Sequence, residues 1–186
     1  MIKGRPEQLD DARAVILVEG ESDRAAVEAA AATLNFDLGA DDVQIRVLGG
    51  ATNFDKALRS LRDWPDMVIA GLCDANEASM WRDICGRHDS ADVRFYVCDR
   101  DLEDELLRAC GIERVETYIE SVGELRPLRT MRKQGPWIDK PAMDQLHRFI
   151  RVKATRNIGY GSGLMALLDA DEIPKPIAAL LRSVCG

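Results

Sequence analysis

The stretch AVILVEGESD, residues 14–23, joins a short apolar run to a group of acidic residues. Its first five residues are apolar and rich in β-branched side chains, a pattern typical of a buried strand. Glu19 and Gly20 follow, and the alanine-rich segment from Ser22 to Leu34 has high helix propensity. The stretch therefore predicts a strand that ends at a carboxylate and is followed by a helix, with Ser22 near the helix N-cap.

The same alternation continues along the next part of the chain. Further strands are predicted at residues 43–48, 67–73 and 93–98, and helices at 53–61, 77–85 and 102–109. Strands that alternate with helices favour a parallel sheet covered on both faces. The sequence therefore predicts an α/β fold with a parallel four-stranded sheet flanked by helices.

After Gly111 the strand pattern stops, and the remaining segments are predicted to be helical. We expect a short N-terminal segment over residues 1–12, an α/β core over residues 13–111 and a helical C-terminal extension over residues 112–186. The extension is expected to pack on the core as part of one domain, since the whole length is that of a single domain.

Composition and charge exclude several classes of protein. The 186 residues are 46% hydrophobic and 31% charged, which argues against collagen-like, mucin-like and disordered chains. The net charge of −7 argues against a protein coated in basic charge, but not against a local basic patch.

No apolar run reaches the ~18 residues of a membrane helix, and the first residues lack the apolar core of a signal peptide. Five cysteines without a CxxC pair favour a reduced, cytoplasmic protein that does not bind membranes.

Acidic residues follow three of the four predicted strands. Glu19 follows the first strand and Asp74 the third, and the segment from Asp99 to Glu103 follows the fourth. Because the carboxyl ends of parallel strands meet at one edge of a sheet, these carboxylates should lie close together and repel each other unless a cation neutralises them. Hard divalent cations prefer oxygen ligands and promote phosphodiester chemistry. The sequence therefore predicts a divalent-metal site at this edge.

Three motifs in order, AVILVEGESD, GLCDANE and DRDLEDELL, resemble the Toprim domain shared by topoisomerases, bacterial primases, recombination-repair proteins and certain nucleases. The chain is most similar to the Toprim half of the overcoming-lysogenization-defect (OLD) nucleases. This resemblance extends through PWIDKPAMDQLHRFI and RVKATRNIGY, so that it covers residues 14 to 184. It implies a Toprim-like, Rossmann-like sheet in a small standalone form. No GxxxxGK[ST] loop is present, so either an ATPase is a separate partner chain or the protein works without one.

The resemblance also implies a ligand set for Mg²⁺ or Mn²⁺. The implied metal ligands are Glu19, Asp23, Asp74, Asp101 and Glu103, of which Glu19 and Asp74 are also catalytic. The chain departs from the family's Asp-x-Asp element, because Asn76 stands in place of the second carboxylate. Asn76, through its amide oxygen, and the neighbouring Glu77 are therefore further possible ligands.

A second departure concerns the catalytic lysine of OLD nucleases. Asn157 stands where similar chains have that lysine. Lys153 and Arg156 are nearby in the sequence and are the predicted catalytic cations, because a lysine or arginine stabilises the charge of the phosphoryl-transfer transition state.

Residues 126–156 are strongly basic. They hold nine basic and two acidic residues, a net charge of +7, whereas the remainder of the chain has a net charge of −14. This asymmetry predicts contacts with a nucleic-acid backbone, and Trp137 is available to stack on a base. The predicted nucleic-acid-binding residues are Arg126, Arg129, Arg132, Lys133, Arg148 and Arg151. The alternative is that these are ordinary solvated helix faces.

The function that this combination favours is metal-dependent hydrolysis of DNA phosphodiester bonds, by nicking or cleavage, with a metal-bound water as nucleophile. The first alternative is an RNA-processing Toprim nuclease. The second is a non-catalytic Toprim module that binds nucleic acid or a partner ATPase, which the departures at Asn76 and Asn157 favour. The expected partners are therefore DNA or RNA, a separate ATPase and, in a homodimer, a second copy of the chain.

Overall fold

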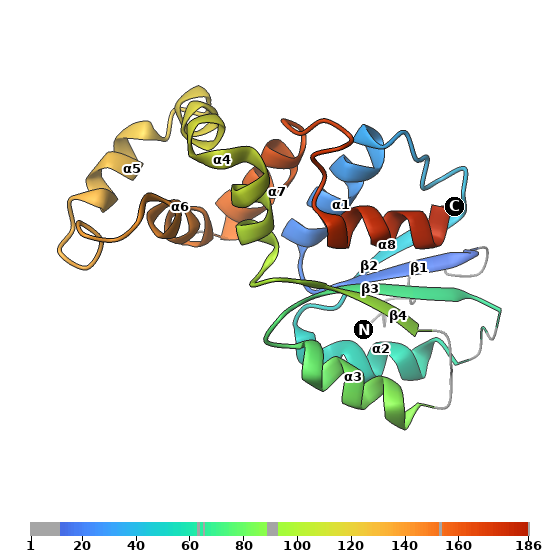
Figure 1. Ribbon diagram of the computed structural model, residues 1–186. Coiled ribbons are helices and arrows are strands. Elements are labelled where there is room, and N and C mark those ends of the chain that lie inside the picture. Colours follow the sequence, from blue (N-terminus) through green and yellow to red (C-terminus); the bar gives the residue numbers. More distant parts are fainter. Residues whose placement is uncertain (1–11, 63, 65, 89–92, 153, 186) are drawn as a thin grey trace, which may run out of the picture.

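The computed structural model describes residues 12–62, 64, 66–88, 93–152 and 154–185, with only the backbone described at residues 51 and 154–158. Its centre is one parallel sheet with the strand order β2-β1-β3-β4 (Figure 1). The strands are β1 (Ala14–Val18), β2 (Val43–Val47), β3 (Val68–Asp74) and β4 (Val93–Cys98). The predicted α/β fold with a four-stranded parallel sheet is confirmed.

Both faces of the sheet are covered, as the continuously apolar strands require. Ala14, Ile16 and Val18 of β1 belong to one buried cluster, and Val15 and Leu17 belong to the other. This split follows from the two-residue period of a strand. The first cluster packs under α1 (Glu21–Thr33) and α8 (Lys175–Cys185), and the second packs under α2 (Phe54–Ser60) and α3 (Ala78–Arg87). A short 3₁₀ turn, η1 (Ala51–Asn53), leads into α2.

The C-terminal helices begin where β4 ends. They are α4 (Leu102–Ser121), α5 (Leu125–Arg132), α6 (Ala142–Arg151) and α7 (Ala154–Met165), after which α8 returns to the sheet. In Figure 1, α5 and α6 lie farthest from the sheet, whereas α7 packs along α1 and α8 packs on β3 and β4. The last helix of the predicted extension is thus part of the cover of the sheet.

Two helix ends show how local chemistry sets the boundaries. Gly111 has φ 73° and ψ 161° inside α4, so the predicted stop at this glycine is a kink between two helical parts of one element. The N-cap of α1 is Gly20, so the prediction of Ser22 for this position is wrong. Instead, Asp23 in the first turn accepts a hydrogen bond from the Gly20 amide over 2.7 Å.

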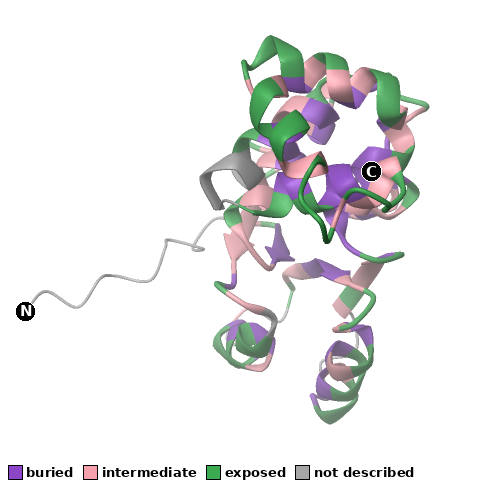
Figure 2. Ribbon diagram, turned by 90° about the vertical axis from the view of Figure 1, so that its left-hand side faces the viewer, coloured by how far each residue is buried: buried purple, intermediate pink, exposed green. Residues whose placement is uncertain are grey.

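Buried residues lie on the inner faces of the helices, and exposed residues lie on their outer faces (Figure 2). None of the described helices has the length and the apolar character needed to cross a membrane. Under α2 and α3, the fully buried Trp81 ring stacks on Phe54 with centroids 3.8 Å apart. A Cβ atom at Gly71 of β3 would lie only 2.6 Å from Cζ3 of Trp81. Gly71 therefore provides the space that the indole ring occupies.

We expect Gly71→Ala to destabilise the protein by about 1–3 kcal/mol, because the added methyl group overpacks a filled core against a ring with no room to move. The matched control is Gly86→Ala, at an exposed position of α3 where nothing lies within 4 Å of the added Cβ atom. This control should be neutral or stabilising by up to about 1 kcal/mol. Urea unfolding of both variants checks the prediction, and equal stabilities would contradict it.

Candidate metal centre

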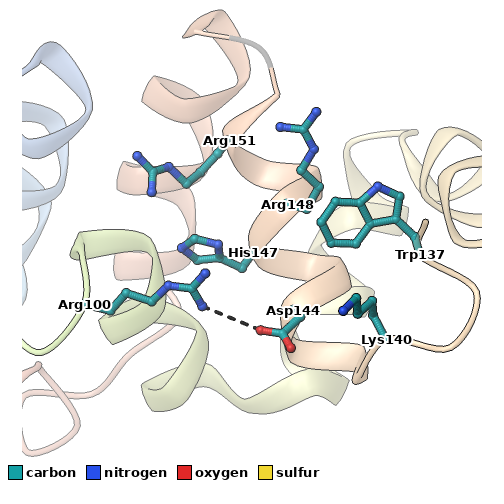
Figure 3. A pocket seen from close by; sticks show the side chains of 7 residues that line it. All are labelled: Arg100, Trp137, Lys140, Asp144, His147, Arg148 and Arg151. Atoms are coloured by element: carbon teal, nitrogen blue, oxygen red, sulfur yellow. Dashed lines mark ion pairs between the residues drawn. The ribbon is translucent and has the colours of Figure 1, made fainter.

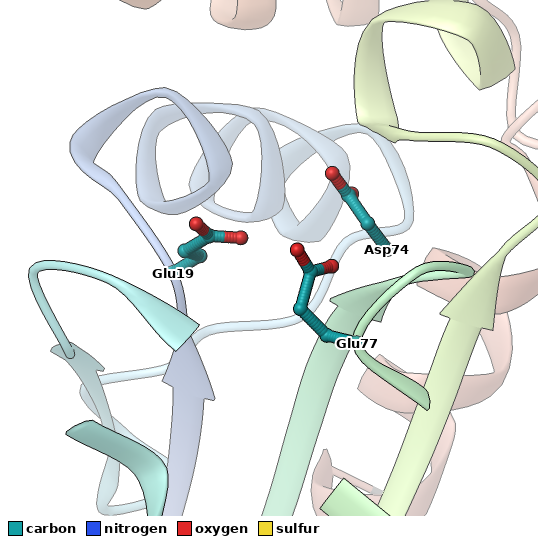
Figure 4. A group of neighbouring side chains, drawn as sticks. All are labelled: Glu19, Asp74 and Glu77. Atoms are coloured by element: carbon teal, nitrogen blue, oxygen red, sulfur yellow. The ribbon is translucent and has the colours of Figure 1, made fainter. Parts of the chain in front are cut away.

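Three carboxylates converge at the carboxyl edge of the sheet (Figure 4). Glu19 follows β1, Asp74 is the last residue of β3, and Glu77 is the N-cap of α3. One oxygen from each side chain lies within 4.8 Å of the other two. We call these three residues the carboxylate group.

Backbone hydrogen bonds hold the carboxylate group in place. The Glu19 carbonyl accepts from the Gly49 and Gly50 amides over 3.0 and 3.2 Å. Both glycines have positive φ, which is why the turn after β2 can present two consecutive amides to one carbonyl. On the other side, the Glu77 amide donates to the Asp74 carbonyl over 3.1 Å, which closes the turn between β3 and α3. The group is thus built on the ends of two neighbouring strands.

The electrostatics of the carboxylate group favour a bound cation. Burial, followed by the charges of Glu77, Asp101 and other nearby acids, raises the pKa of Asp74 to about 8. Burial and the charge of Glu19 also raise the pKa of Glu77. In addition, Oε2 of Glu77 is a buried oxygen with no hydrogen-bond partner in the described structure. Such an atom is costly, and a divalent cation would both satisfy it and relieve the repulsion. The donor set therefore fits Mg²⁺ or Mn²⁺.

Asp23 and Glu103 lie at the same acidic edge but outside the carboxylate group. Burial, together with the charges of Glu103 and Glu19, raises the pKa of Asp23 to about 7, although its hydrogen bond from the Gly20 amide acts in the opposite direction. Glu103 is buried in the first turn of α4, and its pKa is raised chiefly by burial. Asp23 therefore acts on the group directly, since its charge raises the pKa of Asp74, whereas Glu103 acts on Asp23.

Asp101, another predicted metal ligand, is bound by His147 and Arg151 of α6. It is the N-cap of α4 and accepts from the Asp104 amide over 2.9 Å. His147 Nε2 and Arg151 Nη1 donate to its Oδ2 over 2.8 and 2.6 Å, and His147 Nε2 also lies 2.9 Å from Oδ1. Burial would raise the pKa of Asp101, but these bonds and charges outweigh burial and lower it. The structure thus engages both oxygens of Asp101 in a contact between α4 and α6.

The remaining predicted site residues differ in whether the structure describes them and whether they belong to the carboxylate group. Asn76 is exposed in the turn after β3, and Glu77 is the residue of this turn that joins the carboxylate group. Lys153 lies outside the described residues, and so does the side chain of Arg156. Arg151 is a described cation whose charge acts on the site, because it lowers the pKa of Asp23, Glu77 and Glu103.

Some of the predicted nucleic-acid-binding residues line one pocket, and the others lie outside it. Arg148 and Arg151 line a pocket of about 540 Å³ beside α6 (Figure 3), together with Arg100 and Lys140, which the sequence analysis missed. Arg126 and Arg129 of α5 and the following Lys133 are exposed and do not line this pocket, and Arg132 pairs with Glu116 over 2.6 Å. One signal in the sequence points to Arg100, since it lies between the first two aspartates of DRDLEDELL.

Comparison with known proteins gives one family match for the first part of the chain. Residues 12–70 match the model of the overcoming lysogenization defect protein-like TOPRIM domain family, a match that includes Glu19 and Asp23 and ends before Asp74. No curated protein sequence gives a significant match to the chain.

Two solved structures share the fold over most of their length. The C-terminal region of the Xanthomonas campestris pv. campestris OLD protein has a TM-score of 0.66 at 23% identity, covering 93% of this chain and 92% of that one. The C-terminal region of the Burkholderia pseudomallei OLD protein has a TM-score of 0.65 at 18% identity, covering 93% and 97%. The recognition made from the three acidic motifs is thus confirmed: residues 12–70 match the overcoming-lysogenization-defect-like Toprim family model, and the chain has the fold of the C-terminal regions of OLD proteins.

Proposed function

We propose that this protein is a divalent-metal-dependent nuclease that hydrolyses phosphodiester bonds of DNA. The observation that carries the proposal is the carboxylate group, whose buried Glu77 Oε2 has no hydrogen-bond partner in the described structure. Among the described residues, no lysine or arginine forms an ion pair with Glu19, Asp74 or Glu77. A Toprim domain of the OLD type is a metal-binding module of the nuclease kind, which supports the same assignment.

The roles of the residues follow from their positions. Glu19, Asp74 and Glu77 would hold Mg²⁺ or Mn²⁺, which supplies Lewis-acid activation of the phosphate and of the attacking water. Arg151, fixed by its bond to Asp101, would offset the charge that develops on the phosphate. His147 would keep Asp101 and α6 in place, as a positioning residue. Lys153 and Arg156 stay predicted cations for the same step.

The two alternative functions differ in how they would use the carboxylate group. An RNA-processing nuclease would use the same carboxylate group on a different sugar backbone. A non-catalytic module would bind nucleic acid or a partner ATPase without cleavage. The presence of Glu77 in the group, in spite of Asn76, supports a metal site with three carboxylates and favours an enzyme.

We expect the protein to nick supercoiled plasmid in Mg²⁺ or Mn²⁺ and not in EDTA. Glu19→Gln and Asp74→Asn should each lower the rate by about 10²-fold or more, since each removes a ligand charge from the metal. Asp83→Asn, an exposed acid of α3 outside the site, is the matched control and should keep the full rate. Gel assays of the four proteins measure this.

Three outcomes would argue against the DNA nuclease. Equal nicking by wild type and Asp74→Asn would mean that the cleavage comes from elsewhere. Cleavage of an RNA substrate but not of DNA would favour the RNA-processing enzyme. Metal binding without cleavage of either would favour the non-catalytic module.

The raised carboxyl pKa values make stability depend on pH and on metal. In metal-free protein, Asp23 (pKa about 7) and Asp74 (pKa about 8) retain protons that the unfolded chain has already lost, so their contribution to stability falls as pH rises from about 4 to about 8. A bound cation offsets this loss, whereas protons compete with it at pH 6.

We therefore expect Mn²⁺ to raise the Tm more at pH 8 than at pH 6. At a hundredfold excess over Kd, the gain is about 2.7 kcal/mol, or roughly 5–10 °C for a chain of this size. Differential scanning fluorimetry measures the shift, with Asp74→Asn as the variant that should lose it. A shift of the same size at both pH values, or in that variant, would show that the metal binds elsewhere.

A further inference from the structure

The pocket beside α6 has a surplus of positive charge. Its lining includes Arg100, Lys140, Arg148 and Arg151 but a single carboxylate, Asp144 (Figure 3). Its volume of about 540 Å³ is within the range of sites that enclose a small molecule or part of a larger one. The charge of the lining therefore selects an anionic occupant.

Two of the four cations that line the pocket are paired with carboxylates, and the other two carry the surplus positive charge. Arg100 lies 3.6 Å from Asp144, and Arg151 is bound to Asp101. Arg148 and Lys140 are exposed, and neither has a carboxylate within ion-pair distance in the described part of the chain. An exposed guanidinium or ammonium group that is not paired with a carboxylate is suited to bind a phosphate.

The aromatic wall of the pocket specifies the occupant further. The Arg148 guanidinium lies over the Trp137 ring, with Cζ 5.8 Å from the ring centroid. The buried Gln145 donates to the Trp137 carbonyl over 2.7 Å, which fixes this loop to α6. A fixed, half-buried indole ring beside phosphate-binding cations is the combination that binds single-stranded nucleic acid, since a base stacks on the ring. Inside a duplex both faces of each base are covered by its stacked neighbours, so an unpaired base is better suited to present its face to the ring.

Three residues that line the pocket also contact the segments next to the carboxylate group. His147 and Arg151 line the pocket and also donate to Asp101. The Arg100 carbonyl accepts from the amide of Ala75, which directly follows Asp74. An occupant of the pocket therefore lies next to the loops that carry the candidate metal ligands.

We propose that this pocket binds an unpaired nucleotide of the nucleic-acid substrate, with its base on Trp137 and its phosphate on Arg148 and Lys140. This inference rests on the proposed nuclease function and specifies its substrate class, which is nucleic acid with a single-stranded segment beside the cleaved bond. Fully paired duplex without such a segment cannot fill the pocket.

Fluorescence anisotropy in EDTA tests the proposal without any contribution from cleavage. The probes are a labelled oligothymidylate of about ten nucleotides, which is within the usual site size, and a blunt duplex of the same length. The full chain should bind the single strand more tightly than the duplex. Trp137→Ala should weaken single-strand binding by about 5- to 150-fold and change duplex binding much less. Trp137→Phe, which keeps an aromatic face, should restore a large part of the affinity.

Arg148→Gln tests the phosphate contact. It should weaken single-strand binding and reduce the slope of log Kd against log salt by about 0.7, the value for one phosphate of a single strand. Arg182→Gln removes the same charge from an exposed position of α8 outside the pocket, and it should leave both quantities close to wild type. Thermal melts confirm that each variant is folded.

The outcomes separate this inference from the nuclease proposal. Equal affinity of Trp137→Ala and wild type for oligothymidylate, or equal affinity of wild type for strand and duplex, overturns the pocket even if plasmid nicking persists. Single-strand binding that depends on Trp137 and Arg148 supports the pocket even if no metal-dependent cleavage is found, in which case the nuclease proposal alone fails.

Discussion

Mutual repulsion among carboxylates at one edge of a parallel sheet is the constraint around which this site is arranged. The fold places Glu19 and Asp74 at adjacent strand ends, and buried acids in helix first turns surround them. Such a cluster is stable only if positive charge or protons neutralise it. For Asp101 the structure provides a hydrogen bond to His147 and the charge of Arg151. For the carboxylate group it provides raised pKa values and an unpaired oxygen, which is why a metal ion is the counter-charge that fits.

The contact between Asp101 and α6 has a second consequence. It brings a basic helix to the acidic edge, so that a pocket rich in arginine lies next to the candidate metal ligands. In the proposed enzyme, substrate phosphates and the metal ion would thus have separate, adjacent places. The net charge of −7 for the whole chain hides this division, because opposite charges are gathered on neighbouring elements.

Much of the fold is readable from the sequence because its signals are local. The apolar runs, the alanine-rich first helix and the positions of the glycines predict the four strands and the helices between them. The place of Glu19 and Asp74 at one edge follows from strand direction alone. The return of α8 to the sheet is set by tertiary packing, which no local pattern encodes.

The composition of the site is harder to predict, because it too depends on packing between elements that are far apart in the sequence. The partner of Asp101 is His147, 46 residues later, and nothing in the spacing joins them. The turn after β3 decides that Glu77 faces Glu19 while Asn76 is exposed. Arg100 and Lys140 become neighbours only because α4 and α6 pack together.

We propose that Glu19, Asp74 and Glu77 hold a divalent cation. The most direct test of this metal site is a crystal structure with Mn²⁺, in which anomalous diffraction locates the metal independently of any activity. We expect an anomalous peak within coordination distance of oxygens from all three side chains, with Asp101 still bound to His147 and Arg151. A peak held by Asp101 in place of its α6 partners, or no peak among the three carboxylates at saturating Mn²⁺, would contradict it.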